Sequence, residues 1–95
     1  MIKIRVKTEE GKKIISKVTD RYIRALGAAP FYWRSNEFII LSAERAIFSA
    51  IAEEAGKDFY KYFDLIEGYW VSGDRIVRAR DWLRQKLCDG GDVRG

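Results

Sequence analysis

Basic side chains outnumber acidic ones near the start of this chain, and their spacing suits contacts with phosphate. In the stretch MIKIRVK, three cations occupy alternate positions, as they would on one face of a β-strand. Four more recur at intervals that place them within an arc of about 80° on an α-helix. The candidate phosphate-binding residues are Lys3, Arg5, Lys7, Lys13, Lys17, Arg21 and Arg24. If the strand and the helix expose them on adjoining faces, they form one basic patch that fits a nucleic-acid backbone.

Four further arginines lie in the stretch DRIVRARDWLRQKL, whose apolar periodicity predicts a helix over residues 75–88. On that helix they flank an apolar arc of about 140°, so their alkyl stems cover the core while the guanidinium groups stay in water. The arc consists of Ile76, Ala79, Trp82, Leu83 and Leu87, and the flanking residues are Arg75, Arg78, Arg80 and Arg84. We interpret these arginines mainly as the solvated sides of a helix.

Other kinds of chemistry are poorly represented. The chain has no histidine and a single cysteine, Cys88, so it lacks the residues for a common zinc site or for a Ser–His–Asp or Cys–His nucleophile. The carboxylates nearest to a cation-binding set are Glu53, Glu54, Asp58, Asp64 and Glu67, but no calcium-loop or phosphate-loop motif accompanies them. We therefore predict no metal, no cofactor and no enzymatic activity.

Aromatic residues are the second kind of candidate, because they serve both as stacking platforms for bases and as anchors of protein interfaces. They make up 14% of the chain, which is more than a small core needs for bulk alone. The candidates for stacking or for an interface are Tyr32, Trp33 and Trp70.

The composition is that of one globular domain with an uneven charge distribution. The chain has 95 residues and a net charge of +4. Residues 1–27 carry eight Lys or Arg against three Asp or Glu, residues 28–68 carry four against seven, and residues 69–95 carry six against four. A dipolar molecule of this kind supports nucleic-acid binding less strongly than a uniformly basic one.

Cysteine and amide content bear on the setting of the protein. One cysteine excludes an intramolecular disulfide, and no apolar run approaches the ~18 residues that span a bilayer. We therefore expect a cytoplasmic protein that does not bind membranes. The few side-chain amides beside many Lys, Arg and Glu residues are typical of a thermophilic source, although chance in a short chain explains them equally well.

The first half of the chain has clear element signals. Alternation predicts a strand over 2–6, and apolar spacing predicts a helix over 8–27 with Thr8 as its N-cap and Gly27 at its end. An alternative places a hairpin turn at EEGK and a second strand over 12–18, which Gly11 favours. Two short aromatic and β-branched runs around Arg34–Glu37 predict a β-hairpin.

The second half reads as helical. A helix is predicted from the cap Ser42 to Gly56, with an apolar face of Ala43, Ala46, Ile47, Ala50 and Ile51. A short helix capped by Asp58 is predicted over 57–68, an extended connection or short strand over 69–74, and a last helix over 75–88. Residues 1–88 then form a single compact α+β domain, and residues 89–95 a flexible C-terminal tail.

Together these patterns predict an α+β fold, in which a small antiparallel sheet packs against helices in the order β-α-β-β-α-α-α. For function we expect a small non-enzymatic accessory protein that binds nucleic acid, DNA or RNA, through the N-terminal basic patch. The alternative is a protein-binding modulator or inhibitor of viral or mobile-element type that occupies the surface of a host protein. A homodimer is compatible with either function.

Overall fold

The computed structural model describes residues 1–27 and 30–92, and within them five strands form one antiparallel sheet. The elements in chain order are β1 (Ile2–Val6), α1 (Glu9–Leu26), β2 (Phe31–Arg34), β3 (Glu37–Ile40), α2 (Glu44–Ala55), the 3₁₀ turn η1 (Gly56–Asp58), α3 (Phe59–Tyr62), β4 (Phe63–Ser72), β5 (Arg75–Arg78) and α4 (Ala79–Asp92). The predicted α+β class with an antiparallel sheet is therefore confirmed.

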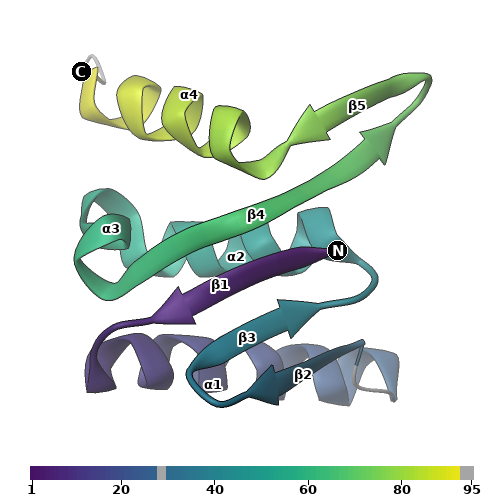
Figure 1. The fold of residues 1–95 in the computed structure, drawn as a ribbon, viewed down its shortest axis with the longest axis vertical. Helices are drawn as coiled ribbons and strands as arrows, with labels where there is room; N and C mark the ends of the chain where they lie inside the picture. Colours follow the sequence, from purple (N-terminus) through teal and green to yellow (C-terminus); the bar gives the residue numbers. More distant parts are fainter. Residues whose placement is uncertain (28–29, 93–95) are drawn as a thin grey trace.

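The sheet has the strand order β2-β3-β1-β4-β5. The main elements from β1 to β4 follow the β-α-β-β-α-β connectivity of the ferredoxin-like motif, and β5 and α4 are appended to it. Figure 1 shows α1 and α2 behind the sheet, while the front of the sheet carries no helix of the described residues. We call this front the uncovered face. Because the motif hosts many unrelated functions, it does not by itself assign one.

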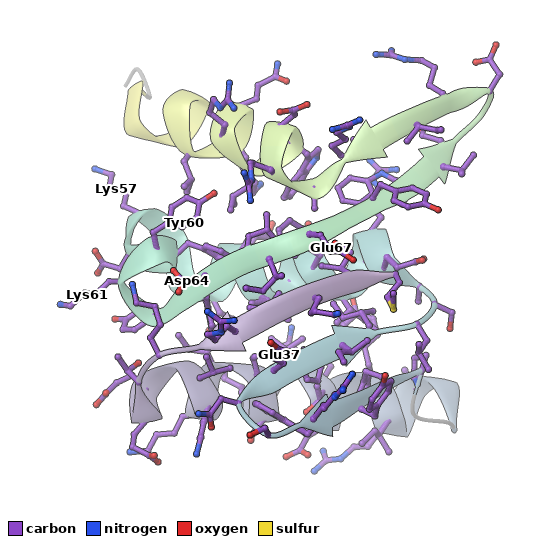
Figure 2. All side chains as sticks on the ribbon, viewed as in Figure 1. Glu37, Lys57, Tyr60, Lys61, Asp64 and Glu67 are labelled. Carbon is purple, nitrogen blue, oxygen red and sulfur yellow. The ribbon has the colours of Figure 1, made fainter. Side chains whose placement is uncertain are left out.

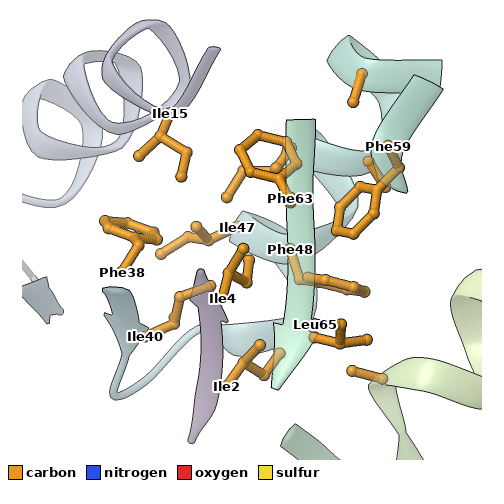
Figure 3. Close-up of a cluster of buried hydrophobic side chains, with 14 of the residues drawn as sticks. Ile2, Ile4, Ile15, Phe38, Ile40, Ile47, Phe48, Phe59, Phe63 and Leu65 are labelled. Atoms are coloured by element: carbon orange, nitrogen blue, oxygen red, sulfur yellow. The ribbon is translucent and has the colours of Figure 1, made fainter. Parts of the chain in front are cut away.

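The core lies between the sheet and the helices behind it. Alternate residues of β1 point into it, and Ile2 and Ile4 are completely buried. Figure 3 shows these side chains meeting those of α1, α2, β3 and β4. The largest fully buried side chains are Phe38, Phe48, Phe59, Phe63, Ile2, Ile4, Ile15, Ile39, Ile40, Ile47, Ile51 and Leu83. Burial of so much apolar surface is the main favourable term in folding a chain of this size.

Residues 9–26 form the helix α1, and not the hairpin turn and second strand that the sequence allows as an alternative. The Thr8 hydroxyl accepts a hydrogen bond from the Gly11 N–H at 3.0 Å, and Gly27 ends the helix at φ 67°. Gly11 lies in the first turn of the helix and is buried, because the junction of α3 and β4 passes close to it. A Cβ there would lie 3.0 Å from Phe63 Cε1 and 3.1 Å from the Tyr62 carbonyl oxygen. The glycine that suggested a turn therefore serves helix-to-strand packing.

Helix α2 forms as expected but presents a different face to the core. Ala43, in the left-handed region at φ 55°, precedes its first residue, and no side chain caps the helix, so the predicted Ser42 cap is wrong. The buried residues of α2 are Ile47, Phe48, Ile51, Ala52 and Ala55. The smaller Ala46 stays exposed because the sheet receives the bulkier Phe48 instead.

The segment from 57 to 78 differs most from expectation. Only Phe59–Tyr62 is α-helical, after the 3₁₀ turn, and Phe63–Ser72 is the longest strand of the sheet. Residues 75–78 are the strand β5, paired with β4 through the two-residue turn at Gly73 and Asp74. The predicted short helix over 57–68 and the start of the last helix at 75 are therefore wrong.

The last helix is displaced toward the C-terminus. α4 begins at Ala79 and continues to Asp92, so residues 89–92 of the predicted flexible tail are helical. Residues 93–95 of that tail lie outside the described residues. Trp82 is half-buried and packs between Phe48 and Trp70, with ring centroids 5.7 Å from each. Arg80 Nη2 donates to the Leu65 carbonyl oxygen at 3.1 Å, which ties α4 to the edge of β4.

Gly68 is the position where the fold depends most on a missing side chain. Its φ is 157°, and a Cβ would lie 2.8 Å from Ile2 Cα, so an alanine forces β4 away from β1. We expect Gly68→Ala to lower the free energy of unfolding by about 2–4 kcal/mol, from overpacking and backbone strain together. The measurement is urea unfolding of the variant and the parent protein.

Gly27→Ala is the matched control, because Gly27 also has positive φ but a Cβ there meets nothing within 4 Å. It should cost only about 1–2 kcal/mol, the usual penalty for a left-handed alanine. Equal losses in the two variants would show that close packing of β4 on β1 is not what requires Gly68.

Candidate functional site: the uncovered face of the sheet

The cations of β1 lie on the uncovered face, between acidic neighbours. Because Ile2, Ile4 and Val6 point into the core, Lys3 and Arg5 point to the front. The register places Arg5 opposite Glu37 on β3 and opposite Asp64 on β4. Lys3 lies opposite Glu67 on β4. Figure 2 shows Glu37 on one side of β1 and Asp64 and Glu67 on the other.

These neighbours form ion pairs across the strands. Arg5 Nη2 lies 3.5 Å from Glu37 Oε2, and Lys7 Nζ lies 3.7 Å from Asp64 Oδ1. Lys7 Nζ also donates to the Tyr60 carbonyl oxygen at 2.9 Å. Each exposed pair contributes at most about 1 kcal/mol to stability. Their larger effect is to balance the positive charge of β1 on this face.

The cations of α1 form a separate row on the other side of the sheet. Lys13, Lys17, Arg21 and Arg24 are all exposed. Lys17 Nζ and Arg21 Nη2 share the carboxylate of Glu54 on α2, at 3.3 Å and 3.8 Å. The structure thus does not bring the seven predicted phosphate-binding residues together, because the sheet separates the group on β1 from the row on α1.

The three predicted aromatic contacts also lie in different places. Tyr32 is 44% exposed and points to the uncovered face, where it is the cross-strand partner of Ile39. Trp33 is 41% exposed on the helix side of the sheet, and its ring centroid lies 5.2 Å from that of Phe38. Trp70 is only 6% exposed, so the structure places it in the core and not at an interface.

The centre of the uncovered face lacks a stacking platform. Sheets that bind single-stranded RNA in the manner of an RNA-recognition motif stack bases on aromatic residues of the sheet. On the central strand β1 and its neighbour β3, the side chains at the front are Lys3, Arg5, Glu37 and Ile39. None of these is aromatic, and Ile39 is almost fully buried. This face therefore offers no continuous surface for bases.

An apolar cluster occupies one end of the uncovered face. Val71 and Ile76 are cross-strand partners on β4 and β5, and they are 66% and 69% exposed. Tyr69, two residues before Val71, is 51% exposed, and the nearby Met1 is 45% exposed. We call Met1, Tyr69, Val71 and Ile76 the apolar strip. The sequence pattern does not reveal this strip, because it places Ile76 on the buried side of a predicted helix.

The apolar strip borders a hollow with charged walls. The hollow has a volume of about 490 Å³ and is lined by Met1, Glu67, Gly68, Tyr69, Ile76 and Arg78. Glu67 and Arg78 bring opposite charges to an otherwise largely apolar lining. A hollow of this composition accepts an apolar side chain flanked by polar groups.

The β4–β5 hairpin, which carries Tyr69, Val71 and Ile76 of the strip, is anchored from behind. Trp70 and Val77 point away from the strip, toward the core. The Trp70 ring lies 6.2 Å from that of Phe48 and 5.7 Å from that of Trp82, measured between centroids. The apolar strip is therefore a surface on a packed element and not the side of a loose loop.

A wider groove lies beside the strip, between β4 and the start of α2. It has a volume of about 990 Å³, and Met1, Glu44, Tyr69 and Val71 are among its lining residues. Burial raises the pKa of Glu44, but hydrogen bonds from its own backbone and from the Met1 α-amino group, and the charge of that group, lower it more. The net pKa lies below 4.5. The ion pair of Glu44 with the Met1 α-amino group therefore stabilises the fold at a pH above the ordinary pKa of a glutamate. This contribution is lost as the pH falls through the lowered pKa of Glu44.

Two further observations bear on the kind of site. Among the side chains that the structure describes, which exclude those of residues 88–95, no three carboxylate or cysteine groups gather as a metal site would require. Within residues 1–27 and 30–92, no helix is long and apolar enough to cross a membrane.

Comparisons with protein-family models, with curated proteins and with solved structures found no match to this chain.

The different environments of two tryptophans give a stability prediction. Trp70 is 6% exposed and lies at the junction of β4, α2 and α4, so we expect Trp70→Ala to cost about 3–5 kcal/mol. Trp33 is 41% exposed, and Trp33→Ala should cost about half as much or less. Thermal and chemical unfolding of both variants measure the difference. A loss for Trp70→Ala no larger than for Trp33→Ala would contradict the placement of Trp70 in the core.

Proposed function

We propose that this chain is a non-enzymatic protein-binding module that docks through the apolar strip. The observation that carries the proposal is the gathering of Met1, Tyr69, Val71 and Ile76 at one end of a sheet face over which no described helix lies. Soluble proteins rarely leave apolar side chains clustered in water unless a partner covers them. This function corresponds to the modulator or inhibitor that the sequence offered as its alternative.

The surroundings of the strip support a protein partner over a small molecule. The hollow at the strip is open, and its apolar floor is bordered by the charges of Glu67 and Arg78. A protein interface has this anatomy, in which an apolar centre excludes water and a polar rim sets orientation. The mainly β-branched and aromatic strip also offers rigid side chains, which lose little conformational freedom when they bind.

The composition supports a role without catalysis. The sequence contains no histidine, which is the side chain most often used for proton transfer near neutral pH. A binding module needs only a surface, and the strip together with its charged rim supplies one.

Site-specific photocrosslinking tests the proposal. A benzoylphenylalanine at position 76 should give one discrete adduct with a different protein in lysate of the source cells. Unlabelled wild-type chain should compete for that adduct, whereas a Val71→Asp chain should not, because a buried charge without a partner is costly. The same probe at position 23 is the matched control, because Ile23 is also exposed, at 42%, but lies on α1.

An adduct of equal yield from positions 76 and 23 would contradict docking through the strip. So would competition by Val71→Asp as effective as that by wild type. Circular dichroism of the Val71→Asp chain establishes that it is folded, and an exposed position such as Val71 should tolerate the substitution.

Nucleic-acid binding is the second function that we propose, now through the row on α1 alone. The supporting observation is that Lys13, Lys17, Arg21 and Arg24 are exposed along one helix, and that three of them border a hollow of about 560 Å³. Glu54 holds Lys17 and Arg21 in ion pairs, so a phosphate has to compete with one carboxylate for two of the four cations.

That competition gives a specific prediction. If four phosphate contacts form, the log–log slope of duplex affinity against salt is about −3.6. Glu54→Gln should tighten binding at low salt because it releases Lys17 and Arg21. Glu53→Gln removes the same charge one residue away and should tighten binding less. Lys3→Ala should leave the slope nearly unchanged, because Lys3 lies on the opposite side of the sheet.

Fluorescence anisotropy with a labelled duplex and a labelled single strand measures these effects. Absence of binding to either probe at low salt would end the nucleic-acid proposal. Equal gains from Glu54→Gln and Glu53→Gln would show that net charge, and not the row on α1, governs the affinity.

A further inference from the structure

The strand β5 leaves one edge of the sheet open. It is the last strand in the order β2-β3-β1-β4-β5, and in the described part of the chain no strand other than β4 pairs with it. An open edge exposes unpaired backbone N–H and C=O groups, which are a template for another strand. The opposite edge strand, β2, is open as well, because the Pro30 carbonyl oxygen accepts from the Leu41 N–H and the proline therefore directs its nitrogen toward β3 and not to the edge. Charge complementarity therefore has to decide whether the β5 edge pairs with a second copy.

The hairpin geometry decides which backbone groups of β5 point outward. The two-residue turn at Gly73 and Asp74 closes on the pair Ser72 and Arg75. In such a hairpin the closing pair exchanges hydrogen bonds, and the direction alternates along the strand. Arg75 and Val77 thus direct their N–H and C=O groups toward β4. Ile76 and Arg78 direct theirs to the open edge.

This alternation restricts how a second copy of β5 can pair. An antiparallel partner must place outward-pointing residues opposite each other, so Ile76 faces Ile76 or Arg78 of the second copy. The register centred on Ile76 brings Ile76 opposite its own copy and Arg78 level with Asp74 in the turn of the second copy. The register centred on Val77 would place each Ile76 against an arginine. The register centred on Arg78 would place two arginines together, which is unfavourable.

We propose that two copies of this chain form a symmetric dimer by pairing their β5 edges in the register centred on Ile76. Charge complementarity selects this register, because the two-fold axis creates the pair of Asp74 and Arg78 twice. Neither residue has an ion-pair partner among the described residues of its own chain. The Ile76 side chains of the two copies meet at the axis and shield each other from water.

The dimer has a consequence for the uncovered face. A two-fold axis perpendicular to the sheet keeps the fronts of both sheets on the same side. The two apolar strips then become one continuous surface across the axis, with the helices of both copies behind it. This inference is independent of the partner proposed above, since a partner can bind the joined face or the face of one copy.

Charge reversal tests the pairing directly. Sedimentation equilibrium of the wild-type chain should show a monomer–dimer equilibrium. Asp74→Arg and Arg78→Asp should each weaken dimerisation by about tenfold or more, because each change acts at two symmetry-related pairs. The double variant that exchanges the two charges should restore dimerisation to within a few-fold of wild type.

The matched control is Asp20→Arg, the same change of charge at an exposed position on α1, which should leave the dimer intact. Thermal unfolding establishes that each variant is folded. A wild-type chain that stays monomeric at millimolar concentration overturns the proposal. So does a dimer that the single reversals weaken no more than Asp20→Arg, or that the exchange fails to restore. These results contradict the dimer and leave open whether a probe at position 76 crosslinks to a different protein. The dimer and the docking function can therefore be contradicted independently of each other.

Discussion

The pairing of β1 between β3 and β4 is the constraint on which the rest of the structure depends. On its helix side β1 buries the side chains of Ile2, Ile4 and Val6 in the core. Its backbone is hydrogen-bonded to β3 along one edge and to β4 along the other. A shift of one residue would reverse the two faces, so the apolar row fixes the register. Gly68 belongs to the same constraint, because only a residue without a Cβ lets β4 approach Ile2 this closely.

That constraint also decides which charges meet. Once the apolar row of β1 points to the helices, its cations point to the front, between the carboxylates of β3 and β4. The row on α1 lies on the other side of the sheet and pairs with α2 through Glu54. The cations that follow one another in the sequence thus lie in two separate regions of the structure, one on β1 and one on α1, and each region contains ion pairs with carboxylates. The apolar strip arises elsewhere, because β4 continues beyond Gly68, its last partner on β1, and there carries Tyr69 and Val71 beside Ile76 of β5.

Several elements follow from local signals, and others do not. The strand 2–6, the helix ending at Gly27 and the hairpin at 31–40 form as predicted, because alternation, capping and turn residues agree there. In FDLIEG the apolar spacing fits a helix as well as a strand. Only pairing with β1 makes Phe63 and Leu65 a strand with two buried side chains. The signal missed was Ser72–Gly73–Asp74 between two β-branched runs, which is a hairpin pattern.

The sequence by itself determined the α+β class, the central strand and the amphipathic character of α1, because these depend on periodicity and on residues close in the chain. It also determined the chemical inventory, which holds no histidine and many cations. Only the tertiary structure decided that Trp70 is core and that Val71 and Ile76 share an exposed face. Strand pairing is non-local, so the side of a sheet on which a residue lies depends on partners far along the chain. For the same reason, only the structure shows which cations are already paired and which edges of the sheet stay open.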